Sequence, residues 1–307
     1  PEKALAAYKK ALSIKSEFAE AYNNLGALLN EQGKLEKALS AFERAIIIKP
    51  DYADVYNNMG GALREQGKID EARDAFKKVI SINPDHESAK HMLSSLSGDT
   101  PKTAPKQYVE SLFDGYAAKF ENSLTGNLGY NIPELVTDLL VKLNRKKSLG
   151  SVLDLGCGTG LLGTEIKNYC SNLEGIDLSD RMLKIADQKQ VYSSLSKIDI
   201  VEYLSSEKLN FDYFIALDVF IYVGDLYEIF RLIKSKNKKS GKLVFSTEHT
   251  ERDGYHLLQT GRYSHSKSYI ESLCKEFGYE ISHFAISDLR KERKVYLEGG
   301  IYIFVHL

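Results

Sequence analysis

The sequence predicts two domains of different kinds: an α-helical repeat solenoid over residues 1–97, and an α/β domain with a mostly parallel sheet over residues 108–307. Three observations lead to this. A block of sequence recurs early in the chain, and a buried strand is followed by a glycine-rich turn and a helix from residue 152. Strands and helices then alternate to the end. A length of 307 residues suits two domains.

The repeat in the first domain is visible in the residues themselves. The segment AYNNLG at 21–26 recurs as VYNNMG at 55–60, an interval of 34 residues. Each unit is expected to hold two amphipathic helices, and Gly26 and Gly60 let neighbouring helices approach closely. The pattern resembles the tetratricopeptide repeat (TPR), which implies a stacked array whose last helix, at 86–96, acts as a cap.

The repeats also suggest a partner. Asn24 and Asn58 occupy equivalent positions one repeat apart, and we expect them to form a ladder on the concave face. An asparagine ladder can hold a protein or peptide by its backbone amides. The alternatives are that both residues satisfy local backbone groups, or that the stack associates with itself to give a homo-oligomer. Because the chain begins at Pro1 within a helical pattern, we expect the array to be truncated at its N-terminus.

Composition excludes several classes of function. The net charge of −1 gives no reason to expect a nucleic-acid or membrane partner. No apolar run approaches the ~18 residues of a membrane span, and no signal peptide is evident. The three cysteines are too few for a disulfide framework and lack metal-ligand spacing, so we expect no metal site and a cytoplasmic protein.

A linker and a helical segment separate the two domains. Residues 98–107 contain two prolines and a glycine without apolar periodicity, which predicts a linker. In the following segment, aromatic residues recur on one helical face. Tyr116 and Tyr130 carry hydroxyls that suit a position at the rim of a ligand, although aromatic stripes more often belong to a core.

The α/β domain places its candidate residues at one edge of the sheet. The predicted strands are 151–155, 172–177, 191–192, 211–217, 242–246, 281–286 and 300–306, with the last two antiparallel because only a loop joins them. Ligands of open α/β sheets bind beyond the carboxyl ends of the strands. The residues at those ends are the loop at 156–160, Asp177, Asp199, Asp218 and Glu248.

Two cofactor classes compete for the glycine loop. A dinucleotide fingerprint requires G-x-G-x-x-G and an acid about 20 residues further on. Here the third glycine is Gly160, and Leu161 stands where the fingerprint needs it. Asp177 supplies the acid, which would bind a ribose in either class. Asp154 within the strand and the antiparallel final pair of strands favour a cofactor that is not a dinucleotide.

Residues 152–160, VLDLGCGTG, resemble the first motif of class I S-adenosylmethionine (SAM)-dependent methyltransferases. The resemblance covers residues 108–307 and implies a seven-stranded Rossmann-like sheet. The whole chain is similar to TPR proteins of a predicted methyltransferase family, through LFDGYAAKF at 112–120 and GRYSHS at 261–266.

The resemblance also implies roles for individual residues. The glycines would pack against the methionine and ribose of the cofactor, Asp177 would bind the ribose hydroxyls, and Asp199 with Ile200 would border the adenine. Tyr116 would belong to a lid. The full expected cofactor set is Asp154, Gly156, Cys157, Gly158, Gly160, Asp177, Leu178, Asp199, Ile200, Leu217, Tyr116 and Tyr130.

Candidates for the catalytic side follow the fourth and fifth strands. They are Asp218, Glu248, His249, Arg262, Tyr263 and His265. We interpret His265 as a general base and Arg262 as a clamp for a carboxylate. Asp218 would orient an amine. The alternative is that the loop at 262–266 only caps the following helix.

Four functions remain open from the sequence. The first is a methyltransferase whose repeats hold a protein or peptide substrate. The second is a methyltransferase for a small-molecule acceptor, with repeats used for assembly. The third is a scaffold that binds SAM without turnover, and the most distant is a nicotinamide-dependent reductase.

Overall fold

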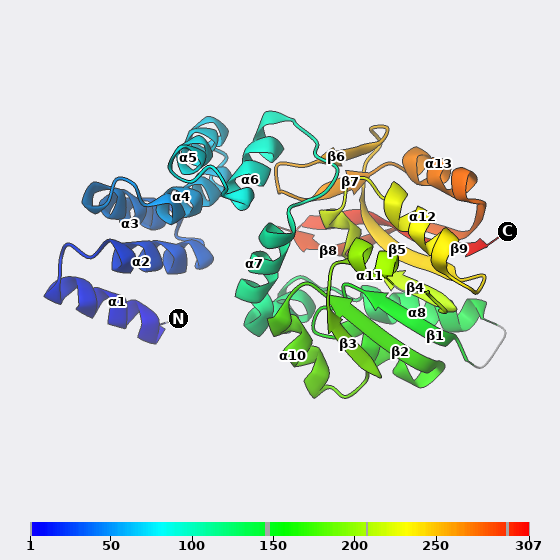
Figure 1. Ribbon diagram of the computed structural model, residues 1–307. Helices are drawn as coiled ribbons and strands as arrows, with labels where there is room; N and C mark the ends of the chain where they lie inside the picture. Colours follow the sequence, from blue (N-terminus) through cyan, green and yellow to red (C-terminus); the bar gives the residue numbers. More distant parts are fainter. Residues whose placement is uncertain (1, 145–147, 207, 293–294, 307) are drawn as a thin grey trace. The chain divides into compact units, whose positions relative to one another are not determined.

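The computed structural model describes residues 2–144, 148–206, 208–292 and 295–306. The chain forms two compact units, Pro1–Asp99 and Thr100–Leu307 (Figure 1). The first unit is all helical and the second is α/β, as the sequence predicts. No helix among the described residues is long and apolar enough to cross a membrane.

The first unit is a run of paired helices. They are α1 (Glu2–Ile14), α2 (Ala19–Glu31), α3 (Leu35–Ile48), α4 (Ala53–Glu65), α5 (Ile69–Ile82) and α6 (Glu87–Ser97). A Cβ atom on Gly26 would lie 2.5 Å from the Phe42 ring, and one on Gly60 would lie 2.9 Å from the Phe76 ring. Both rings are buried. The glycines therefore let each aromatic ring of a second helix pack directly against the backbone of the first.

The segment that we predicted as a linker is mostly part of the second unit. The amide of Ala104 donates to the Tyr222 carbonyl over 3.0 Å, and the amide of Gly224 donates to the Lys102 carbonyl over 2.9 Å. Thr103 also forms an isolated antiparallel bridge with Val223. Two prolines make this stretch look unstructured in sequence, but the Lys102 carbonyl and the Ala104 amide pair with the backbone of residues 222–225.

The second unit combines a sheet with flanking helices. The helices are α7 (Lys106–Tyr116), η1 (Ala117–Lys119), η2 (Asn122–Asn127), α8 (Ile132–Leu143), α9 (Leu161–Ile166), η3 (Lys167–Tyr169), α10 (Asp180–Gln188), α11 (Ile200–Ser206), η4 (Phe220–Tyr222), α12 (Tyr227–Lys236) and α13 (Lys267–Phe277). The strands are β1 (Gly150–Leu155), β2 (Cys170–Asp177), β3 (Ser194–Lys197), β4 (Tyr213–Ala216), β5 (Lys242–His249), β6 (Tyr255–Leu257), β7 (Tyr263–His265), β8 (Tyr279–Glu292) and β9 (Val295–His306).

The strand order explains where a ligand can bind. Strands β3, β2, β1, β4 and β5 pair in parallel in that order, and β9 then pairs antiparallel with both β5 and β8. A short hairpin of β6 and β7 joins the end of β5 through Glu248 and His249. The chain reverses its direction of winding at β1 and β4, so their carboxyl ends form the switch point of the sheet.

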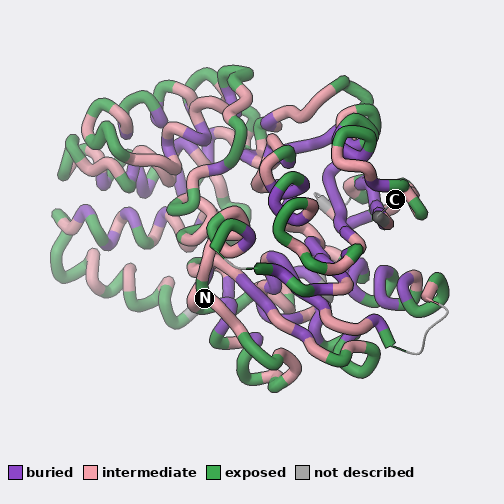
Figure 2. Tube along the Cα trace, turned by 45° about the vertical axis from the view of Figure 1, so that its right-hand side comes forward, coloured by how far each residue is buried: buried purple, intermediate pink, exposed green. Residues whose placement is uncertain are grey.

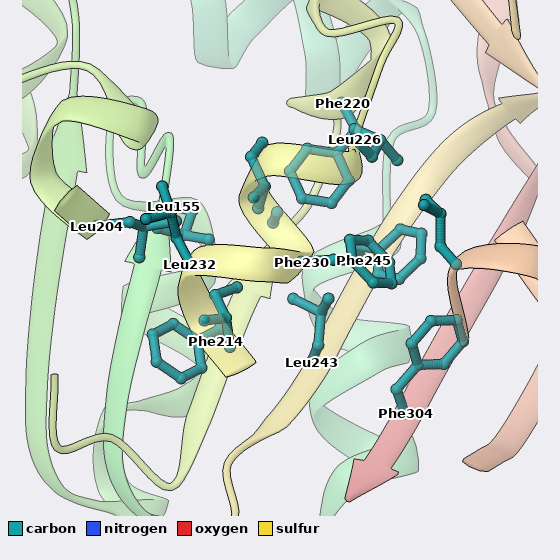
Figure 3. Close-up of a cluster of buried hydrophobic side chains, with 14 of the residues drawn as sticks. Leu155, Leu204, Phe214, Phe220, Leu226, Phe230, Leu232, Leu243, Phe245 and Phe304 are labelled. Carbon is teal, nitrogen blue, oxygen red and sulfur yellow. The ribbon is translucent and has the colours of Figure 1, made fainter. Parts of the chain in front are cut away.

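Apolar side chains cover both faces of this sheet. Helices α11, α12 and α13 pack on one face, where Phe230 of α12 meets Phe245 of β5 with ring centroids 5.9 Å apart (Figure 3). Helices α8 and α9 cover the other face. Figure 2 shows continuous buried stretches along the central strands, whereas the repeat helices alternate between buried and exposed residues. The two-sided burial fixes the strand ends on which the site is built.

Two strand predictions differ from the structure. The third strand is β3 at Ser194–Lys197 and not at 191–192. Only Leu195 of its four residues is apolar and both end residues are exposed, so the strand has no apolar pattern in the sequence. Strands β8 and β9 are much longer than the predicted 281–286 and 300–306. Their extension carries charged residues of β8 to the ligand edge of the sheet.

Candidate active site

The glycine loop, residues 156–160, turns directly out of β1. Its glycines have positive φ angles of +71°, +54° and +83° at Gly156, Gly158 and Gly160. L-residues with a side chain rarely adopt this conformation. A Cβ on Gly156 would also lie 2.5 Å from the Val219 side chain, just beyond β4. On Gly158 the nearest atoms would be those of the Phe120 ring, 3.8 Å away, which is an ordinary van der Waals distance.

Four of the five amides of this loop are already hydrogen-bonded within the protein. The amides of Gly156 and Cys157 donate to the Ile176 carbonyl over 2.8 and 2.9 Å. Gly160 donates to the Cys157 carbonyl over 2.9 Å, and Gly158 donates to Asp177 Oδ2 over 2.9 Å. A phosphate-binding loop needs amides that point at the ligand. This loop instead offers a smooth glycine surface, which fits SAM better than a dinucleotide.

Asp177, at the end of β2, is held in place by backbone groups. Besides the Gly158 amide, its carboxylate accepts the Ser179 amide at Oδ1 over 2.8 Å. Burial raises its pKa, and these backbone donors oppose the rise. A carboxylate oxygen can accept more than one hydrogen bond, so Asp177 retains acceptor capacity. Its binding of the ribose hydroxyls stays a prediction.

Asp154 lies under the loop and contacts a tyrosine that the sequence did not single out. The Tyr192 hydroxyl donates to Asp154 Oδ2 over 2.6 Å. A Cβ on Gly163 would lie 2.5 Å from the Tyr192 ring, and one on Gly175 would lie 3.0 Å from it. Burial raises the pKa of Asp154 to about 7. Asp154 thus supports the loop from below, and the Tyr192 ring fills the space beside it. Asp154 is not exposed to the cofactor.

The predicted adenine side is built from the end of β3. Asp199 Oδ1 accepts the Glu202 amide over 3.2 Å, which caps the start of α11, and pairs with Lys106 Nζ over 3.2 Å. Ile200 begins α11. The contact of Asp199 with the adenine stays a prediction. Leu178 and Leu217 follow β2 and β4 and are half-buried at the same edge.

Helix α7, the predicted lid, is attached by both apolar and polar contacts. It has no buried residue. The Ser179 hydroxyl donates to Asp114 Oδ1 over 2.5 Å, and this bond lowers the pKa of Asp114. Tyr116, at the helix end, packs edge-on to Phe120 with centroids 5.8 Å apart. Its position over the cofactor stays a prediction.

Tyr130 does not take the rim position that we expected. Its side chain is 8% exposed and packs in the apolar cluster with Ile132 and Val136. Burial raises its pKa well above the ordinary value. Tyr130 is a core residue, because its side chain packs in the apolar cluster between α8 and the sheet.

Four charged side chains from distant segments meet beyond β4 and β5. Arg290 of β8 donates from Nη1 to Asp218 Oδ2 over 2.5 Å and from Nη2 to Glu248 Oε1 over 2.6 Å. Arg262 donates from Nε to the same Glu248 oxygen over 2.5 Å. The side chains of Glu248 and Arg290 are 3% and 9% exposed. Burial raises the pKa of Glu248, and the two arginines oppose this rise. We name Asp218, Glu248, Arg262 and Arg290 the charge cluster.

Sequence reasoning found three members of the charge cluster and missed Arg290. The run RKERK that begins at Arg290 looks like an exposed turn. The structure places Arg290 and Lys291 on the extended β8, where the Lys291 amide donates to the Leu128 carbonyl over 2.8 Å. The sequence signal that could have identified Arg290 is the apolar Leu289 directly before it. In the structure Leu289 is fully buried.

Two predicted catalytic residues are wrong. His265 is fully buried, and its Nε2 lies 3.0 Å from both the Val223 and Gly224 carbonyls, so Nε2 carries the proton. Burial lowers the pKa of His265 to about 4, so it is a poor base at neutral pH. Tyr263 is also fully buried and packs with Leu257. The pairing of β7 with β5 turns both side chains inward.

His249 remains a candidate. Its side chain is 14% exposed, and its Nε2 lies 3.2 Å from Glu251 Oε1. It is the last residue of β5 and directly follows Glu248 of the charge cluster. Successive strand residues point to opposite faces. His249 therefore faces away from Glu248.

In the repeat unit, the predicted asparagine ladder is not formed as expected. Asn58 Nδ2 donates to Asn23 Oδ1 over 2.9 Å, so Asn58 pairs with the residue beside Asn24. Asn24 itself is exposed. A hollow of about 480 Å³ lies elsewhere on this unit, between α2 and α3. Its lining comprises Tyr22, Leu25, Leu29, Glu36, Lys37, Ser40, Ala41 and Arg44.

Family models agree with both units. A tetratricopeptide-repeat model matches residues 17–85. A methyltransferase-domain model matches residues 128–283, about half of the chain. The chain belongs to the methyltransferase-domain family. The matched stretch of this chain begins after η2 and runs through the glycine loop into β8.

Individual relatives give the same fold. The ubiquinone biosynthesis O-methyltransferase of Ralstonia nicotianae is 29% identical over 116 residues, which cover 36% of this chain and 48% of that protein. The chain thus spans about half the length of this curated relative. Magnesium protoporphyrin IX methyltransferase from Synechocystis, with bound S-adenosylhomocysteine (SAH), superposes with a TM-score of 0.51 at 18% identity over 66% of this chain and 99% of that one. A SAM-dependent methyltransferase from Leishmania major gives 0.53 at 13% identity, over 71% and 90%.

Proposed function

We propose that this protein is a methyltransferase that takes its methyl group from SAM bound at the glycine loop. The observation that carries the proposal is the loop itself. Its glycines have positive φ, four of its five amides are bound within the protein, and Asp177 retains acceptor capacity beside it. A loop with few free donors beside a carboxylate acceptor suits a ribose and a thioether chain and is unsuited to a pyrophosphate.

Each neighbouring group has a task in this proposal. SAM supplies an electrophilic methyl group on a sulfonium when bound. Gly158 would provide the surface against which it packs, and Asp177 would accept the ribose hydroxyls. The lid helix α7, held by Asp114 and Ser179, would exclude water. The charge cluster would stand where an acceptor approaches, because Asp218 directly precedes Val219, which contacts the loop.

We further propose that the TPR unit recruits the protein or peptide that carries the methyl acceptor. The support is the repeat architecture and the exposed Asn24 together with the hollow between α2 and α3. A second candidate is a small-molecule acceptor, with the repeats used for assembly. It is favoured by the relative from R. nicotianae, whose name describes ubiquinone biosynthesis.

Labelled SAM distinguishes these candidates. The full chain is incubated with methyl-labelled SAM and a lysate separated into protein and small-molecule fractions. Label in protein supports recruitment by the repeats, and label in small molecules supports the second candidate. Labelling of neither fraction by a protein that binds SAH contradicts transfer and leaves a scaffold.

The role of the repeats is then tested by deleting residues 1–99. Under recruitment, protein labelling falls to background while SAH binding is unchanged. The surface variant Asn24→Arg, in the full chain, should reduce labelling in the same direction. Labelling that survives both changes contradicts recruitment through this unit.

A further inference from the structure

The charge cluster leaves two buried acceptor atoms unused. Among the described residues, Asp218 Oδ1 and Glu248 Oε2 are buried and have no hydrogen-bond partner. The other oxygen of each carboxylate binds Arg290. Since one guanidinium joins both, the two carboxylates lie side by side. A buried polar atom left unpaired costs about 1–3 kcal/mol. Two in one place point to donors that arrive with a ligand.

A third buried polar atom borders the same place. Ser264 pairs with Glu248 in the register of β5 and β7, so the two side chains share a face. The Ser264 hydroxyl is buried and has no partner among the described residues. It can donate or accept a hydrogen bond. The three atoms without partners thus form a polar cluster, and none of them is an isolated unsatisfied atom.

The position of these atoms connects them with methyl transfer. Asp218 follows β4, the neighbour of β1, and Val219 touches the glycine loop at Gly156. Asp218 also has a φ of +58°, a conformation that residues other than glycine rarely adopt. Such strain concentrates at functional sites. The Ser246 hydroxyl accepts the Asp218 amide over 2.9 Å and helps to hold it there.

The charges of the cluster limit what can bind. Two carboxylates and two guanidinium groups balance, and their side chains are mostly buried. A cationic acceptor would add an unbalanced buried charge, and an anion would face two carboxylate oxygens. An uncharged group with hydrogens to donate meets neither penalty.

We propose that Asp218 Oδ1 and Glu248 Oε2 bind the methyl acceptor, and that its reacting group is an uncharged hydroxyl or carboxamide. This proposal rests on the methyltransferase function proposed above. The acceptor's oxygen or nitrogen forms a bond to the methyl carbon as the carbon–sulfonium bond breaks, and that electron pair remains on sulfur. The hydrogen on the acceptor passes as a proton to the carboxylate that held it. Arg290 keeps both carboxylates in place without taking part in the transfer.

A set of matched probes tests this with a binding readout. The full chain is saturated with SAH, and dissociation constants are measured by ligand-observed NMR for phenol, benzamide, anisole, benzoate and benzylamine. Phenol or benzamide is expected to bind about tenfold more tightly than anisole, which cannot donate, and than the two charged probes. Tighter binding of phenol indicates a hydroxyl acceptor, and tighter binding of benzamide indicates a carboxamide acceptor. Equal or tighter binding of anisole, benzoate or benzylamine overturns the proposal.

A pair of variants assigns the binding to the charge cluster. Asp218→Asn should weaken the preferred probe about tenfold. Asp212→Asn is the matched control, because Asp212 lies at the opposite end of β4, where it pairs with Lys239. Retained SAH binding shows that each variant is folded, and the comparison of probes on the unmodified chain stands if a variant is not. Unchanged probe binding in Asp218→Asn contradicts the proposal. Failure of the unmodified chain to bind SAH contradicts the methyltransferase function itself.

Discussion

The glycine loop and the charge cluster lie side by side but are built in opposite ways. The loop and Asp177 come from one strand–turn–helix–strand stretch, and backbone hydrogen bonds fix them. The charge cluster draws its side chains from four segments between residues 218 and 290. The loop therefore depends on local chain geometry, whereas the cluster depends on the pairing of β4, β5, β7 and β8.

The two regions also differ in what they leave unsatisfied. Most amides of the loop donate hydrogen bonds within the protein, so the loop can contact a ligand by its surface but donates few hydrogen bonds to it. The cluster keeps two carboxylate oxygens without partners. The contrast suggests that the loop recognises a cofactor shared by many proteins, while the cluster selects the acceptor particular to this chain.

The largest effect is expected from a side chain in the loop. Gly158→Val should weaken SAH binding about a hundredfold or more, because valine is strained at φ +54° and its branched side chain would extend toward the Phe120 ring from the loop surface on which the cofactor packs. Calorimetric titration measures it. Gly33→Val is the control, since Gly33 has φ +70° and open space but lies in the repeat unit. Equal affinities of the two variants would argue against cofactor binding at the loop.

Removal of the central arginine should destabilise the second unit. Arg290→Met leaves Asp218 and Glu248 as adjacent buried carboxylates, and we expect a loss of about 3–5 kcal/mol in unfolding free energy. Denaturant titration provides the measurement. Arg231→Met removes an exposed pair with Glu228 and should cost less than about 1 kcal/mol. Similar losses in both variants would mean that the cluster is not buried in solution.

The support beneath the loop predicts a pH dependence. Since burial raises the pKa of Asp154 from 3.8 to about 7, the folded protein binds a proton there that the unfolded chain releases. The Asp154 contribution to unfolding free energy therefore falls as pH rises from about 4 to about 7. Asp154→Asn removes this pH dependence. The unfolding free energy of the variant should therefore rise relative to that of the unmodified protein by up to about 4 kcal/mol between about pH 4 and about pH 7. A difference independent of pH would place Asp154 in a solvated setting.

The smallest effect should come from the lid. Asp114→Ala removes the acceptor for the Ser179 hydroxyl and should weaken SAH binding about fivefold or less, because the contact is only partly buried. The same titration detects it. Asp70→Ala is the control, because it breaks an exposed pair with Arg73 in the repeat unit. An unchanged affinity in Asp114→Ala would show that α7 does not cover the cofactor.

The sequence predicts the locally determined features well. The 34-residue interval, the glycines packed against Phe42 and Phe76, and the turn at 156–160 all follow from short-range patterns, and the structure has each of them. The antiparallel end of the sheet follows from the short connection between β8 and β9. Such features need no knowledge of distant neighbours.

Features that depend on distant pairing were not predictable. His265 stands between two serines and reads as exposed, but the register of β7 beside β5 buries it. Tyr192 was assigned to a strand, yet it fills space beside Gly163 and Gly175. Arg290 lies in a charged run, and only the length of β8 places it among carboxylates. In each case the partner that fixes the side chain lies far along the chain.

A comparison of two cofactors in separate titrations tests the central claim most directly. The full chain is titrated with SAH and, separately, with NADH, before and after the change Gly158→Val. The account predicts one SAH bound per chain, loss of that binding in the variant, and no binding of NADH. Binding of NADH that is lost in the variant, with no binding of SAH, would contradict it.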